Sequence, residues 1–246
     1  MRPIILPLFL LACSSLLSPK PAAPLDPDIP PIQEEIAALD GRHGYYHKIY
    51  RNEESLYWRN IPGWMREDAK ERKVARILDI GCGYGTLLAF SSMVYGSAGS
   101  CLDINNYLQP AFLQAHGLQF AKGNIELDEI PWGERFDVVL MTEVLEHFQF
   151  HPLPTLRKIR DALAPGGVFF LSTPDERDWG REYRYYRKLS EMPPPTPGKQ
   201  LPDAHIWIYS KKELVQVLTA AGFTIKRLEY APGKGARHFN VMAVRD

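Results

Sequence analysis

Short runs of consecutive apolar residues alternate with longer amphipathic runs from residue 74 onward. Short apolar runs bounded by glycines are typical of buried strands, and amphipathic runs are typical of helices packed on a sheet. Strands that alternate with helices predict a parallel sheet in a doubly wound α/β fold. The predicted strands are 74–80, 99–104, 118–123, 136–141 and 166–174, and the predicted helices are 86–95, 106–117, 152–163 and 210–222. The last two strands, 223–230 and 238–244, are predicted to form an antiparallel hairpin at the edge of the sheet.

Three other stretches complete the domain organisation. Residues 1–31 contain a short apolar run and then many prolines, so we expect a signal-like segment and an extended tether. Residues 32–73 are rich in aromatic residues and are predicted to form a helical cap. Within the main domain, 74–246, the insertion 175–204 is first basic and aromatic and then proline-rich. It follows the fifth strand, on the side where parallel sheets bind ligands, so we expect it to be functional.

The N-terminal sequence MRPIILPLFLLACSS has two interpretations. A basic residue, an apolar run from Ile4 to Ala12 and then Cys13 resemble the lipobox of bacterial lipoproteins, in which Cys13 would be lipidated. The run itself is too short to span a bilayer. This interpretation predicts a protein anchored to a membrane through its N-terminus. The alternative is a misassigned start codon, which predicts a cytoplasmic protein.

Charge and cysteine content narrow the function only slightly. The chain of 246 residues has 29 basic and 29 acidic residues, so no overall charge draws it to nucleic acid or to an anionic membrane. A local basic patch stays open. None of the three cysteines forms a CxxC pair, and we expect Cys82 and Cys101 to be buried, reduced thiols. Reduced thiols suit a reducing compartment, in conflict with the lipoprotein interpretation.

A glycine loop follows the first predicted strand in the sequence ILDIGCGYG, residues 77–85. Gly81, Gly83 and Gly85 allow the backbone to approach a ligand closely. Their spacing is GxGxG and therefore differs from the GxGxxG of dinucleotide-binding folds, which disfavours an NAD-dependent dehydrogenase. Asp79, just before the glycines, favours a ligand with a cationic amino group. Asp103 ends the second strand, where Rossmann-like folds place an acid on ribose hydroxyls.

Together with other segments, this loop resembles class I S-adenosylmethionine-dependent methyltransferases from Ile77 to Val244. The matching segments are DIGCGYG, CLDIN, FDVVLMTEVLEHF, APGGVFFLSTPD and HIWIYSKKELVQVLTAAGF. The resemblance implies a Rossmann-like seven-stranded sheet of order 3-2-1-4-5-7-6 with strand 7 antiparallel. It also implies that Asp79 and the glycines hold the methionine part of S-adenosylmethionine, Asp103 the ribose, and Asn124 with Ile125 the adenine. The family more often has Asp at the position of Asn124.

The sequence EVLEH, residues 143–147, follows the fourth strand and carries three ionisable groups. One helical turn would place Glu143, Glu146 and His147 on one face. With the later His205, the pattern resembles the metal-binding residues of small-RNA 2′-O-methyltransferases and of ubiquinone-pathway O-methyltransferases. This predicts a site for Mg²⁺, Mn²⁺ or Zn²⁺ made by these four residues. In the alternative without metal, Glu143 contacts the cofactor and His147 or His205 is the general base.

The methyl acceptor is open, although the resemblance favours O-methylation of a small molecule or a lipid, with RNA not excluded. The insertion offers an aromatic wall and positive charge next to the site, from Trp179, Tyr183, Tyr185, Tyr186, Arg181, Arg184 and Arg187. The alternative for these residues is a solvated helix with tyrosines packed on the sheet. The alternative function is a membrane-tethered protein that binds the cofactor and has lost turnover.

Overall fold

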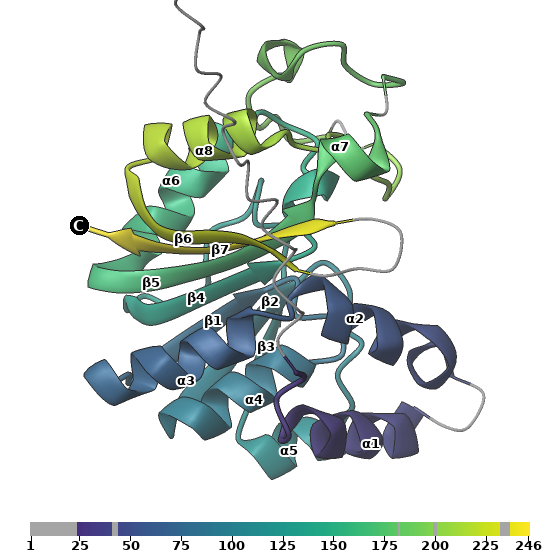
Figure 1. Ribbon diagram of the computed structural model, residues 1–246, viewed down its shortest axis with the longest axis vertical. Coiled ribbons are helices and arrows are strands. Elements are labelled where there is room, and N and C mark those ends of the chain that lie inside the picture. The colour runs from purple at the N-terminus through teal and green to yellow at the C-terminus, as the bar shows by residue number, and fades with distance from the viewer. Residues whose placement is uncertain (1–23, 41–43, 182, 199–200, 232–236) are drawn as a thin grey trace, which may run out of the picture.

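The computed structural model describes residues 24–40, 44–181, 183–198, 201–231 and 237–246. Within them, seven strands form one sheet of order β3-β2-β1-β4-β5-β7-β6, in which β7 is antiparallel to both neighbours (Figure 1). This confirms the predicted doubly wound α/β fold. The strands are β1 Arg76–Ile80, β2 Ala98–Asp103, β3 Gln119–Lys122, β4 Phe136–Thr142, β5 Leu163–Pro174, β6 Phe223–Ala231 and β7 His238–Arg245.

Helices cover both faces of the sheet (Figure 1). One face packs against α1 Ile29–Asp40, α3 Ile61–Glu71, α4 Thr86–Tyr95 and α5 Pro110–His116. The other packs against α6 Pro152–Ala162 and α8 Lys211–Ala220. The shorter helices are the π-helix η1 Tyr46–Tyr50, α2 Arg51–Tyr57, the 3₁₀ helices η2 Leu145–His147 and η3 Leu189–Glu191, and α7 Glu176–Trp179.

Strand β4 shows why the apolar runs are continuous. Val138 and Leu140 belong to the core beneath α1, α3 and α4, whereas Val139 and Met141 belong to the core beneath α6 and α8. Successive side chains point to opposite faces, and both faces are covered, so the consecutive positions from Val138 to Met141 are all apolar. The ionisable residues of the EVLEH sequence therefore come only after this buried part of β4, at its carboxyl end, where the candidate site lies.

The N-terminal helices share the core of the sheet. Ile32 and Ile36 of α1 and Trp64 and Met65 of α3 are buried together with residues of α4. The predicted tether ends too late, because α1 begins at Ile29 and its first turn contains two prolines that we had expected in the tether. Proline is tolerated there because the first amides of a helix have no intrahelical acceptor. The lipobox-like segment at Cys13 lies outside the described residues, and no helix among those described is long and apolar enough to cross a membrane.

A buried carboxylate joins these helices to α4. One Glu54 oxygen accepts hydrogen bonds from Gln33 Nε2 at 2.9 Å, the Tyr46 hydroxyl at 2.7 Å and Thr86 Oγ1 at 2.8 Å. Burial nevertheless raises the pKa of Glu54 from 4.5 to about 7, against the lowering effect of these donors. Because the folded protein holds the proton more tightly than the unfolded chain, the free energy of unfolding falls as pH rises through this interval.

We expect Glu54→Gln to stabilise the protein at about pH 8 and to leave its stability near pH 4 almost unchanged. Glutamine keeps a carbonyl oxygen for the donors and removes the buried charge, whose cost at pH 8 is on the order of 3 kcal/mol. Urea unfolding at the two pH values measures the difference. Glu71→Gln, at an exposed position, is the control and should change neither value. A Glu54→Gln variant no more stable than the parent at pH 8 would contradict the expectation.

Candidate active site

The glycine loop between β1 and α4 lines a cavity of about 690 Å³ at the carboxyl ends of the strands. Gly81 and Gly83 form part of its wall. Gly81 has φ 70°, and a Cβ there would collide with the side chain of Val144. Gly85, with φ 86°, precedes α4 and is not part of the described wall. Two of the three predicted glycines therefore present backbone directly to a ligand.

Two buried aspartates lie beside this loop. Asp103, at the end of β2, accepts hydrogen bonds from the Gly83 amide at 3.1 Å and the Asn105 amide at 2.9 Å, and it lines the cavity. Asp79 is 2% exposed, and its Oδ1 has no hydrogen-bond partner among the described residues. Burial, and then the charge of Asp103, raise the pKa of Asp79 well above its usual value. Asp79 does not itself line the cavity, but it directly precedes Ile80 and Gly81, which do. Because a buried carboxylate oxygen without a partner is costly, Asp79 is suited to a cationic ligand group.

The far wall of the cavity contains the predicted adenine residues. Asn124 and Ile125 both line it, after β3. The side-chain oxygen of Asn124 accepts a hydrogen bond from the Glu126 amide at 2.9 Å, so it is engaged within its own turn. The Ile125 side chain, 5% exposed, offers an apolar contact instead. These two residues thus suit stacking and backbone contact with a planar ring.

At the end of β4, Glu143 adopts φ 55°, which is a left-handed conformation that non-glycine residues rarely take. Its carboxylate accepts a hydrogen bond from Ser172 Oγ at 2.6 Å and lies 2.8 Å from His238 Nδ1. The expected single helical turn is therefore absent, since only Leu145–His147 is helical and its turn is 3₁₀. Such strained conformations concentrate at functional sites.

Three of the four predicted metal ligands meet. Potential ligand atoms of Glu146, His147 and His205 all lie within 4.8 Å of one another. Glu146 is 1% exposed, and one oxygen accepts a hydrogen bond from Thr173 at 3.0 Å. Burial and then Glu143 raise the pKa of Glu146 well above its usual value, whereas burial lowers that of His205. Glu143 is outside this cluster, because it pairs with His238.

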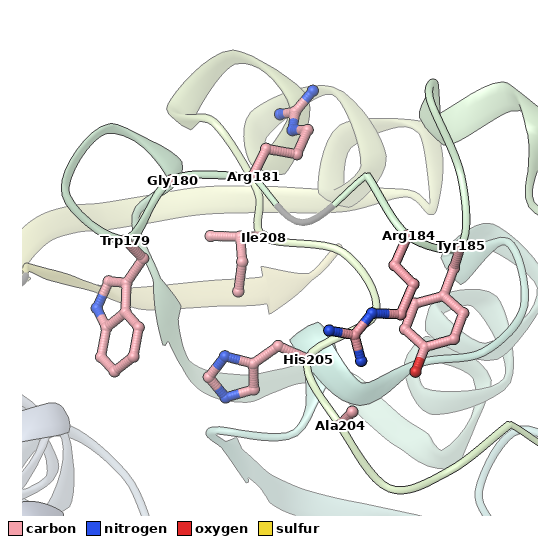
Figure 2. Close-up of a pocket in the computed structure, with 8 residues that line it drawn as sticks. All are labelled: Trp179, Gly180, Arg181, Arg184, Tyr185, Ala204, His205 and Ile208. Carbon is pink, nitrogen blue, oxygen red and sulfur yellow. The ribbon is translucent and has the colours of Figure 1, made fainter.

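The insertion forms a second cavity of about 340 Å³ next to His205. Trp179 and Tyr185 line it, and Figure 2 shows the Arg184 guanidinium directed toward the His205 imidazole. Arg181 points away and pairs with two glutamates of the fold. Of the other predicted wall residues, Tyr183 is 59% exposed and Tyr186 donates a hydrogen bond to a backbone carbonyl, and neither they nor Arg187 line this cavity.

A pair of neighbouring imidazoles lies between the two cavities. His147 lines the larger cavity, His205 lines the smaller one, and their ring centroids are 5.0 Å apart. A compound in the smaller cavity and a ligand in the larger cavity would therefore have two groups that can accept protons between them. This arrangement suits group transfer between two bound molecules.

A family model described as a methyltransferase domain matches residues 56–228. The chain belongs to this methyltransferase family. It is 35% identical over 109 residues to a ubiquinone biosynthesis O-methyltransferase of Dinoroseobacter shibae, which covers 41% of the chain and 42% of that protein. An (S)-coclaurine N-methyltransferase of Thalictrum flavum is 26% identical over 126 residues, or 44% of the chain and 34% of that protein. The chain thus spans less than half the length of these relatives.

Among solved structures, the methyltransferase fold resembles that of a Synechocystis magnesium protoporphyrin IX methyltransferase with bound S-adenosylhomocysteine. The TM-score is 0.58 at 16% identity, over 88% of this chain and 94% of that one. The residues present here fit S-adenosylmethionine, because the Asp79 oxygen that lacks a partner suits the amino group of its methionine part. Asp103, which lines the wall, suits its ribose hydroxyls.

Sequence reasoning missed several residues of the methyltransferase site. Tyr50 and Glu126 line the larger cavity, and His238 contacts Glu143. Glu126 is held by the amides of Gln149 and Phe150, and burial raises its pKa to about 7. An acid in the short loop after β3 Gln119–Lys122 is a usable signal for Glu126. Tyr50 comes from a helix outside the alternating pattern, and no local signal marks it.

The prediction of two free thiols is wrong, because Cys82 and Cys101 form a disulfide with a Cα–Cα distance of 5.8 Å. Their sequence separation of 19 residues concealed the pairing. The chain leaves β1 through the glycine loop and returns as β2, whose Cys101 is in register with Asp79 of β1. The loop residue Cys82 thereby comes back beside Cys101.

We expect Asp103→Ala to lower the affinity of the protein for S-adenosylmethionine by at least about tenfold, or ~1.4 kcal/mol. The substitution removes an acceptor that lines the cavity and also orients the Gly83 amide. Isothermal titration calorimetry measures the change, and Asp161→Ala, at a solvent-exposed position on α6, is the control. An unchanged affinity in Asp103→Ala would remove Asp103 from the cofactor site.

Proposed function

We propose that this protein transfers a methyl group from S-adenosylmethionine to a hydroxyl group of a small-molecule acceptor. The observation that carries the proposal is that His147 of the larger cavity and His205 of the smaller one are neighbours, with ring centroids 5.0 Å apart. The larger cavity has the size and polar groups for the cofactor, which supplies an electrophilic methyl group. The smaller one has aromatic walls for an acceptor. The similarity to O-methyltransferases of ubiquinone biosynthesis supports a hydroxyl acceptor.

In this proposal, residues of the chain bind the cofactor, orient the acceptor and remove the proton of its hydroxyl group. The glycine loop and Asp103 fix the cofactor, and Trp179 and Tyr185 hold the acceptor against it. His205 is the group best placed to accept the hydroxyl proton, because burial lowers its pKa and keeps it neutral near pH 7. Methyl transfer should therefore increase as pH rises through the lowered pKa of His205, where the base form becomes populated.

The test is transfer of tritiated methyl groups to a panel of phenols and catechols, with lipid extracts and RNA as further acceptors. We expect label in a phenol or catechol fraction, and none when the cofactor is withheld. Labelling of RNA alone would replace the small-molecule acceptor. Cofactor binding without transfer to any acceptor in the panel would favour the alternative, a cofactor-binding protein without turnover.

We also propose a divalent metal ion, Mg²⁺, Mn²⁺ or Zn²⁺, at Glu146, His147 and His205. These residues fit a metal because a buried carboxylate and two imidazoles converge, and the closest His147–Glu146 approach of 4.0 Å leaves the carboxylate without a tight cationic partner. A bound ion would lower the pKa of the acceptor hydroxyl. Glu143 would join only after giving up its contact with His238.

Finally, we propose that Cys13 anchors the protein to a membrane as a lipoprotein. The order of basic residue, apolar run, cysteine and prolines supports this, and the Cys82–Cys101 disulfide agrees with an oxidising compartment. S-adenosylmethionine is made in the cytoplasm, so an exported enzyme would need to carry it bound. Mass spectrometry of the native N-terminus is the test: a diacylated Cys13 is expected, and an unmodified Met1 refutes the anchor.

A further inference from the structure

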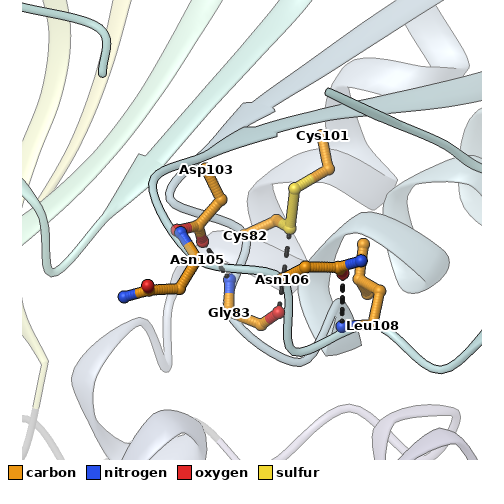
Figure 3. Close-up of a disulfide and its surroundings, with 7 residues drawn as sticks. All are labelled: Cys82, Gly83, Cys101, Asp103, Asn105, Asn106 and Leu108. Atoms are coloured by element: carbon orange, nitrogen blue, oxygen red, sulfur yellow. Dashed lines mark hydrogen bonds between the residues drawn. A yellow bond between two sulfur atoms is a disulfide. The ribbon is translucent and has the colours of Figure 1, made fainter. Parts of the chain in front are cut away.

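The Cys82–Cys101 disulfide connects two walls of the larger cavity. Cys82 lies between Gly81 and Gly83, which both line the cavity, and Cys101 precedes Asp103 on β2 by two residues (Figure 3). Two hydrogen bonds run parallel to this covalent link, from the Gly81 amide to the Leu102 carbonyl at 2.9 Å and from the Gly83 amide to Asp103 at 3.1 Å. The disulfide therefore holds the backbone that would contact the cofactor.

The two ends of this bond differ in their freedom to move. Cys101 is fully buried in β2, which is hydrogen-bonded to β1 on one side and β3 on the other. Cys82 is half-buried in a loop between two glycines with positive φ. Non-bonded sulfur atoms stand farther apart than bonded ones, so two thiols require one residue to shift. The loop end has fewer constraints, and it carries Gly81 and Gly83 with it.

We propose that the Cys82–Cys101 pair is a redox site that sets the affinity for the cofactor, with the disulfide form binding tightly and the dithiol form weakly. This inference rests on the proposed function for the identity of the cofactor. The reductant is a dithiol. One of its thiolates attacks Sγ of the more accessible Cys82 and releases the thiolate of Cys101, which takes up a proton. The second thiol of the reductant then displaces Cys82, leaving two protein thiols and an oxidised, cyclic reductant.

Thermodynamic linkage makes this proposal quantitative. If reduction weakens cofactor binding by a given factor, bound cofactor must make the disulfide harder to reduce by the same factor. The two quantities come from independent measurements, one of heat and one of thiol content. Agreement between them separates a true coupling from general damage to the protein by the reductant.

The experiment compares the full chain, oxidised and reduced by dithiothreitol, with Cys13→Ser in every sample so that only the pair titrates. S-adenosylhomocysteine is the probe in calorimetry, and thiol counting in dithiothreitol redox buffers, with and without the probe, gives the equilibrium of the pair. We expect affinity at least about tenfold lower after reduction, and an equal shift of the redox equilibrium by the probe. The variant Cys82→Ser with Cys101→Ser should bind weakly and be insensitive to dithiothreitol.

Three outcomes overturn the proposal or its basis, and they are distinguishable. Equal or tighter binding by the reduced protein overturns the redox coupling. Loss of the circular dichroism signal on reduction at 25 °C makes the disulfide a bond needed for folding and also overturns it. Absence of binding in both redox forms of a folded protein contradicts the proposed cofactor instead.

Discussion

Gly81→Val is expected to lower the affinity for S-adenosylmethionine by at least about a hundredfold, or ~2.7 kcal/mol. Gly81 has φ 70°, where a β-branched residue is strained, and the added Cβ would collide with Val144 at the end of β4. The loop must therefore move away from the position in which its backbone lines the cavity. Calorimetry with the cofactor measures the loss, because binding requires no knowledge of the acceptor.

Gly133→Val is the matched control for this substitution. A Cβ at Gly133 meets nothing within 4 Å, and this glycine is not among those with positive φ. The control should bind the cofactor as the parent does. Thermal unfolding of both variants separates a local effect from loss of the fold. A folded Gly81→Val variant with parental affinity would show that the cofactor binds elsewhere.

The fold was predictable because burial on both faces leaves a strong local signal. Strand β4 is apolar at consecutive positions, from Val138 to Met141, and glycines follow β1 and β3. The errors occur where a distant partner decides the local structure. Ile29 begins a helix because it is buried in the core that α1 shares with α3 and α4. The prolines after it would by themselves favour an extended chain. Cys82 and Cys101 pair because β1 and β2 are neighbours, which no spacing rule encodes.

The candidate site was predictable to a different degree at each strand end. Asp79, Gly81 and Asp103 follow or end strands in the predicted order, so parallel alignment alone brings them to one edge. His238 begins β7, which the sequence predicts only as part of a hairpin at the edge of the sheet, and it contacts Glu143 because β7 pairs with β5 beside β4. The left-handed conformation of Glu143 then directs its carboxylate toward His238 and Ser172. Sequence spacing carried no sign of that turn.

His205→Ala and Glu146→Ala are each expected to reduce methyl transfer by at least about a hundredfold. The reason is that His205 is placed to accept a proton and Glu146 to bind a cation. Each variant should also lose most of the Zn²⁺ or Mn²⁺ affinity, which calorimetry measures without an acceptor. Cofactor affinity should stay within about twofold in His205→Ala, since His205 lines only the smaller cavity. His116→Ala, at a partly buried position at the end of α5 that lines neither cavity, is the matched control.

The combination of measurements distinguishes the metal from the base. If a divalent ion acts in this cluster, excess EDTA should abolish transfer by the parent protein, and re-added Mn²⁺ should restore it in the parent but in neither variant. Full transfer in EDTA together with an inactive His205→Ala variant would remove the metal and leave His205 as the general base, with a pH profile governed by its lowered pKa. Full activity of both variants would contradict both roles. The acceptor would then have to lose its proton to a group outside the cluster, and the partnered carboxylate of Glu143, held by Ser172 and His238, is the nearest group to test next.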